Sequence, residues 1–241
     1  MHLGKTGSII FGTSIKLSRV DKFEVECDGK VINPTSSVKY LGVTLDQTLN
    51  GESCANSVIR KASGRLSFLY RHGHLLNMKT RKTLCTALIQ CHFDYCCSSW
   101  FSALSVQLKN KLQVMQNKMV RFILDLEPRS HIGSRELNQL GMLPVEARVK
   151  QLKLNHVFKI FHNTAPSYMS HNFKKVSEQH FYSTRGSATN FVVPKIRGQE
   201  NNSFFKTGIQ EWNSLTTKIK ALKTKSQFKA AVKSFLSPKL S

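Results

Sequence analysis

The pattern of apolar and polar positions divides the chain into a short β-rich start and a long helical remainder. An apolar run covers residues 8–12, and residues 22–27 and 30–32 flank Asp28-Gly29, a dipeptide typical of hairpin turns. Residues 38–46 are expected to form a buried strand followed by a turn. These segments predict one small antiparallel sheet. Because too few residues precede this strand to build a whole sheet, we expect the sequence to begin inside a domain.

Helical periodicity takes over after residue 48. The first predicted helix has a core stripe at Val58, Ala62, Leu66 and Leu69. Its cations Arg60, Lys61, Arg65 and Arg71 lie mostly on the other side, and the helix is expected to end at Asn77. The second covers residues 78–101, with cations in its first turn at Lys79, Arg81 and Lys82. The third runs from about Leu108 until Pro128 breaks its pattern, and its predicted core stripe is Leu108, Leu112, Met115, Met119, Phe122 and Ile123. Three amphipathic helices with short connections predict a bundle.

The C-terminal half is also expected to be mainly helical. One helix is predicted from Pro144 to about His162, followed by an irregular connector over residues 163–202 with one strand at 190–193. Helices over 203–220 and 226–236 close the chain. The predicted class is α+β, mostly α, with a sheet in residues 1–48, a bundle in 49–127 and a basic extension in 128–241.

Charge changes this picture from a fold to a candidate function. The 241 residues carry a formal net charge of +22, far more than solubility requires. Residues 1–46 hold six Lys or Arg against five Asp or Glu, so almost all of the excess lies after them. A polyanionic partner is expected, and nucleic acid is favoured over an anionic membrane surface. Residues 83–108 contain one charge, Asp94. A buried helix is favoured over a transmembrane one, because lipid would be a costly environment for Gln90, His92, Asp94, Ser98, Ser99 and Ser102.

Candidate chemistry is sparse. Gly4, Lys5 and Thr6 resemble the end of a phosphate-binding loop but lack its earlier glycine and strand. Cys85, His92 and Cys96 share a predicted helical face, yet a helix spreads the outer pair by roughly 16 Å, too far for one zinc ion. No group of carboxylates suits two-metal chemistry. We therefore assign no catalytic and no metal-binding residue. The six cysteines lack regular spacing and no leader pattern is visible, which favours an intracellular location, cytoplasmic or nuclear.

Several segments together resemble the C-terminal part of reverse transcriptases from non-LTR retrotransposons, most closely the jockey and chicken-repeat branches of the LINE class. The similar segments are residues 2–6, 9–12, 38–46, 88–96, 112–121 and 140–148, with Ala165, Pro166, Tyr168, Trp212 and Asn213. They span almost the entire chain. No single motif carries the resemblance alone, and their combination is specific.

The resemblance implies roles for particular residues. Lys5 matches a palm lysine that follows the catalytic aspartates, Tyr40, Leu41 and Gly42 match the primer-grip turn, and residues 50–125 match the helical thumb. Nucleic acid, as RNA, DNA or a hybrid duplex, is the implied partner, together with the missing N-terminal part of the polymerase; no membrane partner is implied. The catalytic aspartates should precede Met1, so no cofactor is expected here, and Mg²⁺ is expected only in a full-length enzyme. The 241 residues alone should therefore not polymerise nucleotides.

Two other interpretations remain open at this point. The chain is alternatively a module that a host has recruited for nucleic-acid or protein interaction, or the non-functional remnant of a gene. Under the reverse-transcriptase interpretation, the predicted nucleic-acid-binding residues are Lys5, Tyr40, Leu41, Gly42, Arg60, Lys61, Arg65, Arg71, Lys79, Arg81 and Lys82.

Overall fold

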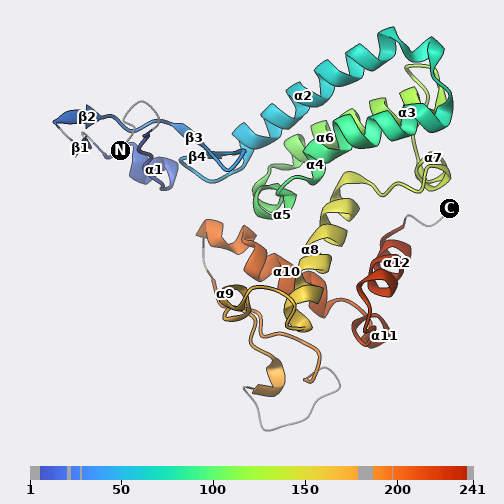
Figure 1. Cartoon of the computed structure of the whole chain (residues 1–241). Helices are drawn as coiled ribbons and strands as arrows, with labels where there is room; N and C mark the ends of the chain where they lie inside the picture. The colour runs from blue at the N-terminus through green and yellow to red at the C-terminus, as the bar shows by residue number, and fades with distance from the viewer. Residues whose placement is uncertain (1–5, 21–22, 28, 179–186, 197, 238–241) are drawn as a thin grey trace.

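A computed structural model describes residues 6–20, 23–27, 29–178, 187–196 and 198–237 of the chain (Figure 1). The protein is mostly helical and contains two small antiparallel sheets, which agrees with the predicted class. Among the described residues, none of the helices combines the length and the apolar content that crossing a bilayer requires.

The N-terminal strands form two hairpins instead of the single predicted sheet. After the short helix α1 (Ser14–Leu17), β1 (Val25–Cys27) pairs with β2 (Lys30–Ile32), and β3 (Ser37–Tyr40) pairs with β4 (Val43–Asp46). The apolar run at residues 8–12 contributes one isolated bridge, from Ser8 to Pro34, and no strand within the described residues.

Residues 38–46 are not one buried strand, so that prediction was wrong. Leu41 and Gly42 have positive φ angles of 46° and 84° and turn the segment back on itself. Two consecutive positive φ values are the geometry of the tight turns that match the twist of paired strands. Only Val43 and Asp46 of this hairpin are buried, while β3 lies largely exposed.

A helical bundle follows the second hairpin. It consists of α2 (Glu52–Arg71), the 3-10 turn η2 (Gly73–Leu75), α3 (Met78–Cys85), the π-helical segment η3 (Thr86–Gln90), α4 (Cys91–Asp94), α5 (Cys97–Trp100), the 3-10 turn η4 (Phe101–Ala103), α6 (Val106–Leu124) and α7 (Ser134–Gln139). The long α2 and α6 pack on each other, and α3 packs on α6 (Figure 1). The predicted stripes of α2 and α6 are buried as expected.

The second predicted helix is interrupted, and its start differs from the prediction. Asn77 does not end α2, because α2 stops at Arg71; instead the Asn77 side chain accepts a hydrogen bond from the Thr80 N–H at 2.9 Å and caps α3. At the other end, Tyr95 is extended and Cys96 is left-handed, with a φ of 48°. These two residues separate α4 from α5, so no continuous helix covers residues 78–101.

The helix α8 (Val145–Phe161) joins two hydrophobic cores. Its first turns, with Val145 and Val149, complete the core of the bundle, while its second half, from Leu154, packs into a C-terminal core. The bundle core also takes in side chains of α7 and its neighbours, including Leu137. The division between the cores therefore falls inside α8, beyond the predicted boundary at residue 127.

The C-terminal core is enclosed by α8, α10 (Phe204–Asn213), α11 (Thr217–Lys220) and α12 (Lys225–Leu236), after the short elements α9 (Ser167–Ser170), η5 (Val176–Glu178) and η6 (Gly198–Asn202). The single helix predicted over 203–220 is two helices, whereas the last helix agrees with its prediction. The predicted strand at 190–193 is reduced to one bridge between Lys175 and Phe191. Asn213 exchanges two hydrogen bonds with the Phe191 backbone and so fixes this connector on α10.

Candidate nucleic-acid interface

The outer face of α2 is basic. Arg60, Lys61, Arg65 and Arg71 are all exposed, because the helical period of 3.6 residues turns the apolar positions of the same helix toward α6. Their exposure agrees with the prediction made from the periodicity. The Arg65 side chain also donates a hydrogen bond from Nη1 to the Leu88 carbonyl oxygen at 3.0 Å, which ties α2 to the π-helical segment η3.

The first turns of α3 add two further cations. Lys79 and Lys82 are exposed. No carboxylate lies in the first turn of α3, where the helix dipole favours negative charge. The helix dipole therefore favours an external anion near this helix start, where the sequence places lysines and no carboxylate.

No carboxylate compensates these six cations. The sequence has no Asp or Glu between Ser53 and Phe93. The nearest acid after that stretch, Asp94, accepts hydrogen bonds from both Arg148 Nε at 3.2 Å and Arg148 Nη2 at 2.7 Å, and another from Gln90. None of the six basic side chains forms a salt bridge within the part of the chain that the structure describes. We define the basic face as these six residues: Arg60, Lys61, Arg65, Arg71, Lys79 and Lys82.

Arg81, which the sequence analysis grouped with Lys79 and Lys82 as a nucleic-acid-binding residue, does not belong to the basic face. It is only 8% exposed, and its guanidinium group lies against the end of α6. Nε and Nη2 donate to the Gly73 carbonyl oxygen, Nη1 donates to the Phe122 carbonyl oxygen at 3.2 Å, and Nη1 pairs with Asp125 at 2.6 Å. A cation at a helix C-terminus is favourable because the last carbonyl groups lack partners within the helix. Arg81 is therefore a structural residue.

Replacing Arg81 with Met is expected to destabilise the bundle without touching the basic face. The Phe122 carbonyl oxygen loses its donor, and a buried polar group left without a partner costs about 1–3 kcal/mol in the free energy of unfolding. Lys79→Met, an exposed change on the same helix, should stay within about 0.5 kcal/mol of the parent protein. Urea unfolding followed by circular dichroism measures both. Equal stability of the two variants would contradict the structural role of Arg81.

The turn that the resemblance assigns to primer binding is held against the bundle by one tyrosine. The Tyr95 hydroxyl group donates a hydrogen bond to the Leu41 carbonyl oxygen at 2.5 Å. A Cβ atom at Gly42 would lie 3.3 Å from the Tyr95 ring, so a side chain there would push against it. Tyr40 and Leu41 are 64% and 76% exposed. The turn thus presents two large apolar side chains to solvent from a fixed position. The other residue assigned to this region, Lys5, lies outside the described residues.

Two features of this region were not identified from the sequence. The π-helical segment η3 lies directly behind Arg65, and π segments occur frequently at functional sites. On α2, Gly64 leaves open space where a Cβ atom would stand, and one turn later Phe68 is 53% exposed with its ring 4.9 Å from that of His72. A glycine in a helix interior costs about 1 kcal/mol relative to alanine, so Gly64 was the signal in the sequence that this part of α2 differs from an ordinary helix interior.

The surroundings of His92, which follows η3 in the sequence, lower its pKa. Burial lowers the pKa of His92, and the nearby cations Arg65 and Lys61 lower it further. A neutral His92 adds no charge of its own near neutral pH, so the positive potential here comes from the Lys and Arg side chains.

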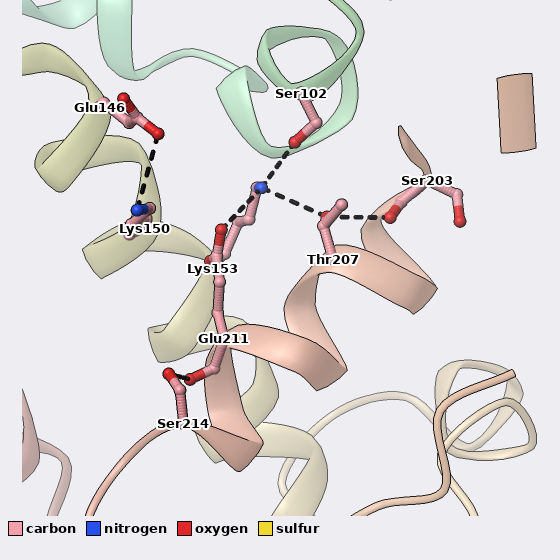
Figure 2. Close-up of polar contacts among 8 residues, drawn as sticks. All are labelled: Ser102, Glu146, Lys150, Lys153, Ser203, Thr207, Glu211 and Ser214. Carbon is pink, nitrogen blue, oxygen red and sulfur yellow. Dashed lines mark hydrogen bonds and ion pairs between the residues drawn. The ribbon is translucent and has the colours of Figure 1, made fainter. Parts of the chain in front are cut away.

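A second polar cluster, at the junction of the two cores, has a structural role. Figure 2 shows the Lys153 ammonium group of α8 between Ser102 on η4 and two residues of α10. It donates hydrogen bonds to Ser102 Oγ at 2.6 Å, to Thr207 Oγ1 at 3.2 Å and to Glu211 Oε1 at 3.2 Å. An ammonium group has three N–H donors, and all three are used here. Lys153 therefore joins the bundle to the C-terminal core and has no donor left for a ligand.

The cysteine and histidine residues that the structure describes do not come together as a metal site. In the described ranges no three His, Cys, Asp or Glu side chains are arranged to hold a metal ion. Burial raises the pKa values of Cys85 and Cys97 to about 12, whereas zinc binds the deprotonated thiolate.

Comparison of the chain with models of protein families, with curated proteins and with solved structures gives no match. The proposal for function therefore rests on the basic face, on the turn at Leu41-Gly42 and on the charge distribution.

Proposed function

We propose that this protein binds nucleic acid through the basic face of α2 and α3, in the manner implied by its resemblance to the thumb of non-LTR retrotransposon reverse transcriptases. One observation carries the proposal: six exposed cations lie on consecutive helices with no carboxylate among them. An ordinary protein surface intersperses both signs of charge. A surface of one sign attracts polyanions, and the phosphate backbone is the usual polyanion for Lys and Arg.

The turn at Leu41-Gly42 has a distinct part in this proposal. Hairpin β3–β4 packs on α2, and Tyr95 fixes the turn to the bundle. A duplex whose phosphates contact the basic face would present a strand end or its bases to Tyr40 and Leu41. Exposed aromatic and apolar side chains bind bases by stacking, which needs no particular sequence. The expected ligand is RNA, DNA or a hybrid duplex, bound without sequence preference.

The salt dependence of binding tests this function. If all six residues of the basic face contact phosphates, counterion release predicts a log–log slope of about −5, so affinity for a short duplex should fall about 10³-fold between about 50 and 200 mM salt. Fluorescence anisotropy with labelled duplexes of two unrelated sequences measures the slope and the sequence preference. An affinity that salt leaves unchanged, or a strong preference for one sequence, would contradict the proposal.

A second candidate function, protein interaction, rests on the N-terminal region. Large hydrophobic side chains are exposed there at Phe11, Ile15, Val20, Phe23, Val25, Val31 and Leu49. Scattered exposed apolar residues are normal, but so many within 39 residues are typical of a contact surface. Salt separates the two candidates, because apolar association persists or strengthens at high salt whereas phosphate binding weakens.

A further inference from the structure

A pocket of about 240 Å³ with both polar and apolar walls lies behind α3, apart from the basic face except for one shared lysine. Its walls come from α3, η3, α6, α8, α12 and the turn after α7. The residues that matter for its chemistry are Lys82, Gln90, Gln116, Arg148, Gln151 and Lys233. Three are cations and three are amides, and no carboxylate lines the pocket among the residues that the structure describes. This composition suits an anion that also accepts several hydrogen bonds.

Two of the three cations have no internal partner. Lys82 and Lys233 are exposed and form no salt bridge within the described ranges. Arg148 pairs with Asp94, so its charge is already balanced. The net excess at the pocket is therefore two positive charges, contributed by lysines from α3 and α12 that are 151 positions apart in the sequence.

The backbone opposite Lys233 leaves room for its ammonium group. Gly141 has a positive φ of 60°, and a Cβ atom there would lie 3.4 Å from Lys233 Nζ. A positive φ strains any residue with a side chain, so glycine both permits this turn and keeps the space above it open. The Lys233 head group thus lies directly over the turn that closes one side of the pocket.

Buried amides and the arginine hold the remaining wall in place. Gln116 is 2% exposed and donates to the Leu143 carbonyl oxygen at 2.9 Å, and Gln151 is 5% exposed and accepts from Arg148 Nη1 at 2.7 Å. Arg148 uses one hydrogen on each of Nε, Nη1 and Nη2 for these protein contacts. Because a guanidinium group has five N–H donors, two remain for a ligand. The pocket therefore offers donors in fixed positions as well as charge.

We propose that this pocket binds a terminal phosphate monoester of a nucleic-acid strand. The volume lies below the range of about 300–1,000 Å³ for sites that enclose a drug-sized ligand, so a phosphoryl group with part of its sugar fits better than a base or a duplex. A monoester carries about −1.5 to −2 charges at neutral pH, which two unpaired lysines match, whereas an internal diester carries one. A walled pocket also admits a strand end more readily than a continuous backbone. The inference rests on the proposed nucleic-acid binding, since it names which part of the strand is recognised.

The test uses the full chain and duplexes that differ only at their ends. Duplexes with a 5′-phosphate, with a 3′-phosphate and with hydroxyl groups at both ends are compared by anisotropy, and the two phosphorylated arms show which end is bound. One phosphorylated duplex should bind about tenfold tighter than the hydroxyl duplex, as expected for charge-assisted hydrogen bonds to one phosphate. Lys233→Gln should remove this difference and leave the affinity for the hydroxyl duplex unchanged. Lys225→Gln, an exposed lysine on the same helix, should retain the difference.

A titration with a nucleoside monophosphate alone separates this inference from the proposed function. Binding of the monophosphate that Lys233→Gln weakens and Lys225→Gln does not would support the pocket even if no duplex bound at all. If hydroxyl duplexes bind well, but terminal phosphates add nothing and the monophosphate does not bind, the pocket assignment is overturned while the basic face stands. Retention of the full terminal-phosphate preference by Lys233→Gln and by Lys82→Gln would also overturn it.

Discussion

Lys153→Met is expected to destabilise the protein by about 3–5 kcal/mol, the largest stability effect of any single change considered. The substitution keeps most of the apolar length of the side chain but removes the ammonium group that pairs with Glu211 and donates to Ser102 and Thr207. Glu211 Oε2 is already buried without a partner among the described residues, so its carboxylate would lose the cation that contacts its other oxygen. Removing one member of a buried ion pair leaves an uncompensated charge, which accounts for the size of the effect.

The expected loss depends on pH. Burial raises the pKa of Glu211, Lys153 lowers it, and removing Lys153 therefore raises it further. A carboxyl group with a raised pKa in the folded state stabilises that state fully below its unfolded pKa and loses this contribution as the pH rises through the folded pKa. The deficit of Lys153→Met should thus be largest near neutral pH and shrink in acid. Urea unfolding of the variant and of the parent protein, at neutral and at acidic pH, measures this deficit in stability. An equal deficit at the two pH values would contradict the ion-pair explanation.

Lys150→Met provides the matched control, because it is the same substitution three residues earlier on the same helix. Lys150 pairs with Glu146 at 3.6 Å, and the two side chains are 42% and 63% exposed, against 4% for Lys153. Exposed pairs of this spacing contribute about 0.3–0.5 kcal/mol, so the control should remain close to the parent protein at either pH.

The helices that the sequence predicted well are those whose burial is one-sided. In α6 the stripe at Leu108, Leu112 and Met119 has a single periodicity and a single core behind it, so pattern and structure agree. The same argument placed Arg60 and Arg71 correctly on the exposed side of α2. Periodicity reports which face of a helix is apolar, and that is sufficient where one face meets one core.

Features that depend on contacts distant in sequence were not predictable in this way. The break at Tyr95-Cys96 places the Tyr95 hydroxyl group on the Leu41 carbonyl oxygen, a contact between residues 54 positions apart. Arg81 looked like its neighbours Lys79 and Lys82, but its contacts with Gly73 and with the end of α6, 41 residues later, make it a buried residue. The pocket between α3 and α12 depends on two lysines that are 151 positions apart in the sequence. In each case the composition of the segment was visible, but its partner was not.

Neutralising the outer face of α2 is expected to weaken nucleic-acid binding about a hundredfold at about 150 mM salt. The variant carries Arg60→Gln, Lys61→Gln and Arg71→Gln; Arg65 is kept because it also holds the Leu88 carbonyl oxygen of η3. Each phosphate contact contributes about 0.9 to the log–log salt slope, so losing three should reduce the slope by nearly three units. Counterion release contributes little to binding near 1 M salt. Extrapolated from there to about 150 mM salt, the change in slope lowers the affinity by a factor of about 10².

The decisive control removes the same charge from another surface. Lys218, Lys223 and Lys229 are exposed on or between α11 and α12, and changing all three to Gln lowers the net charge equally. If the basic face binds phosphates directly, this control should lose only a few-fold in affinity and keep its slope, because charges beyond a Debye length of about 8–10 Å are largely screened. Equal losses in the two variants would mean that net charge alone attracts the nucleic acid and that α2 is not its contact surface. Circular dichroism of both variants confirms that each remains folded.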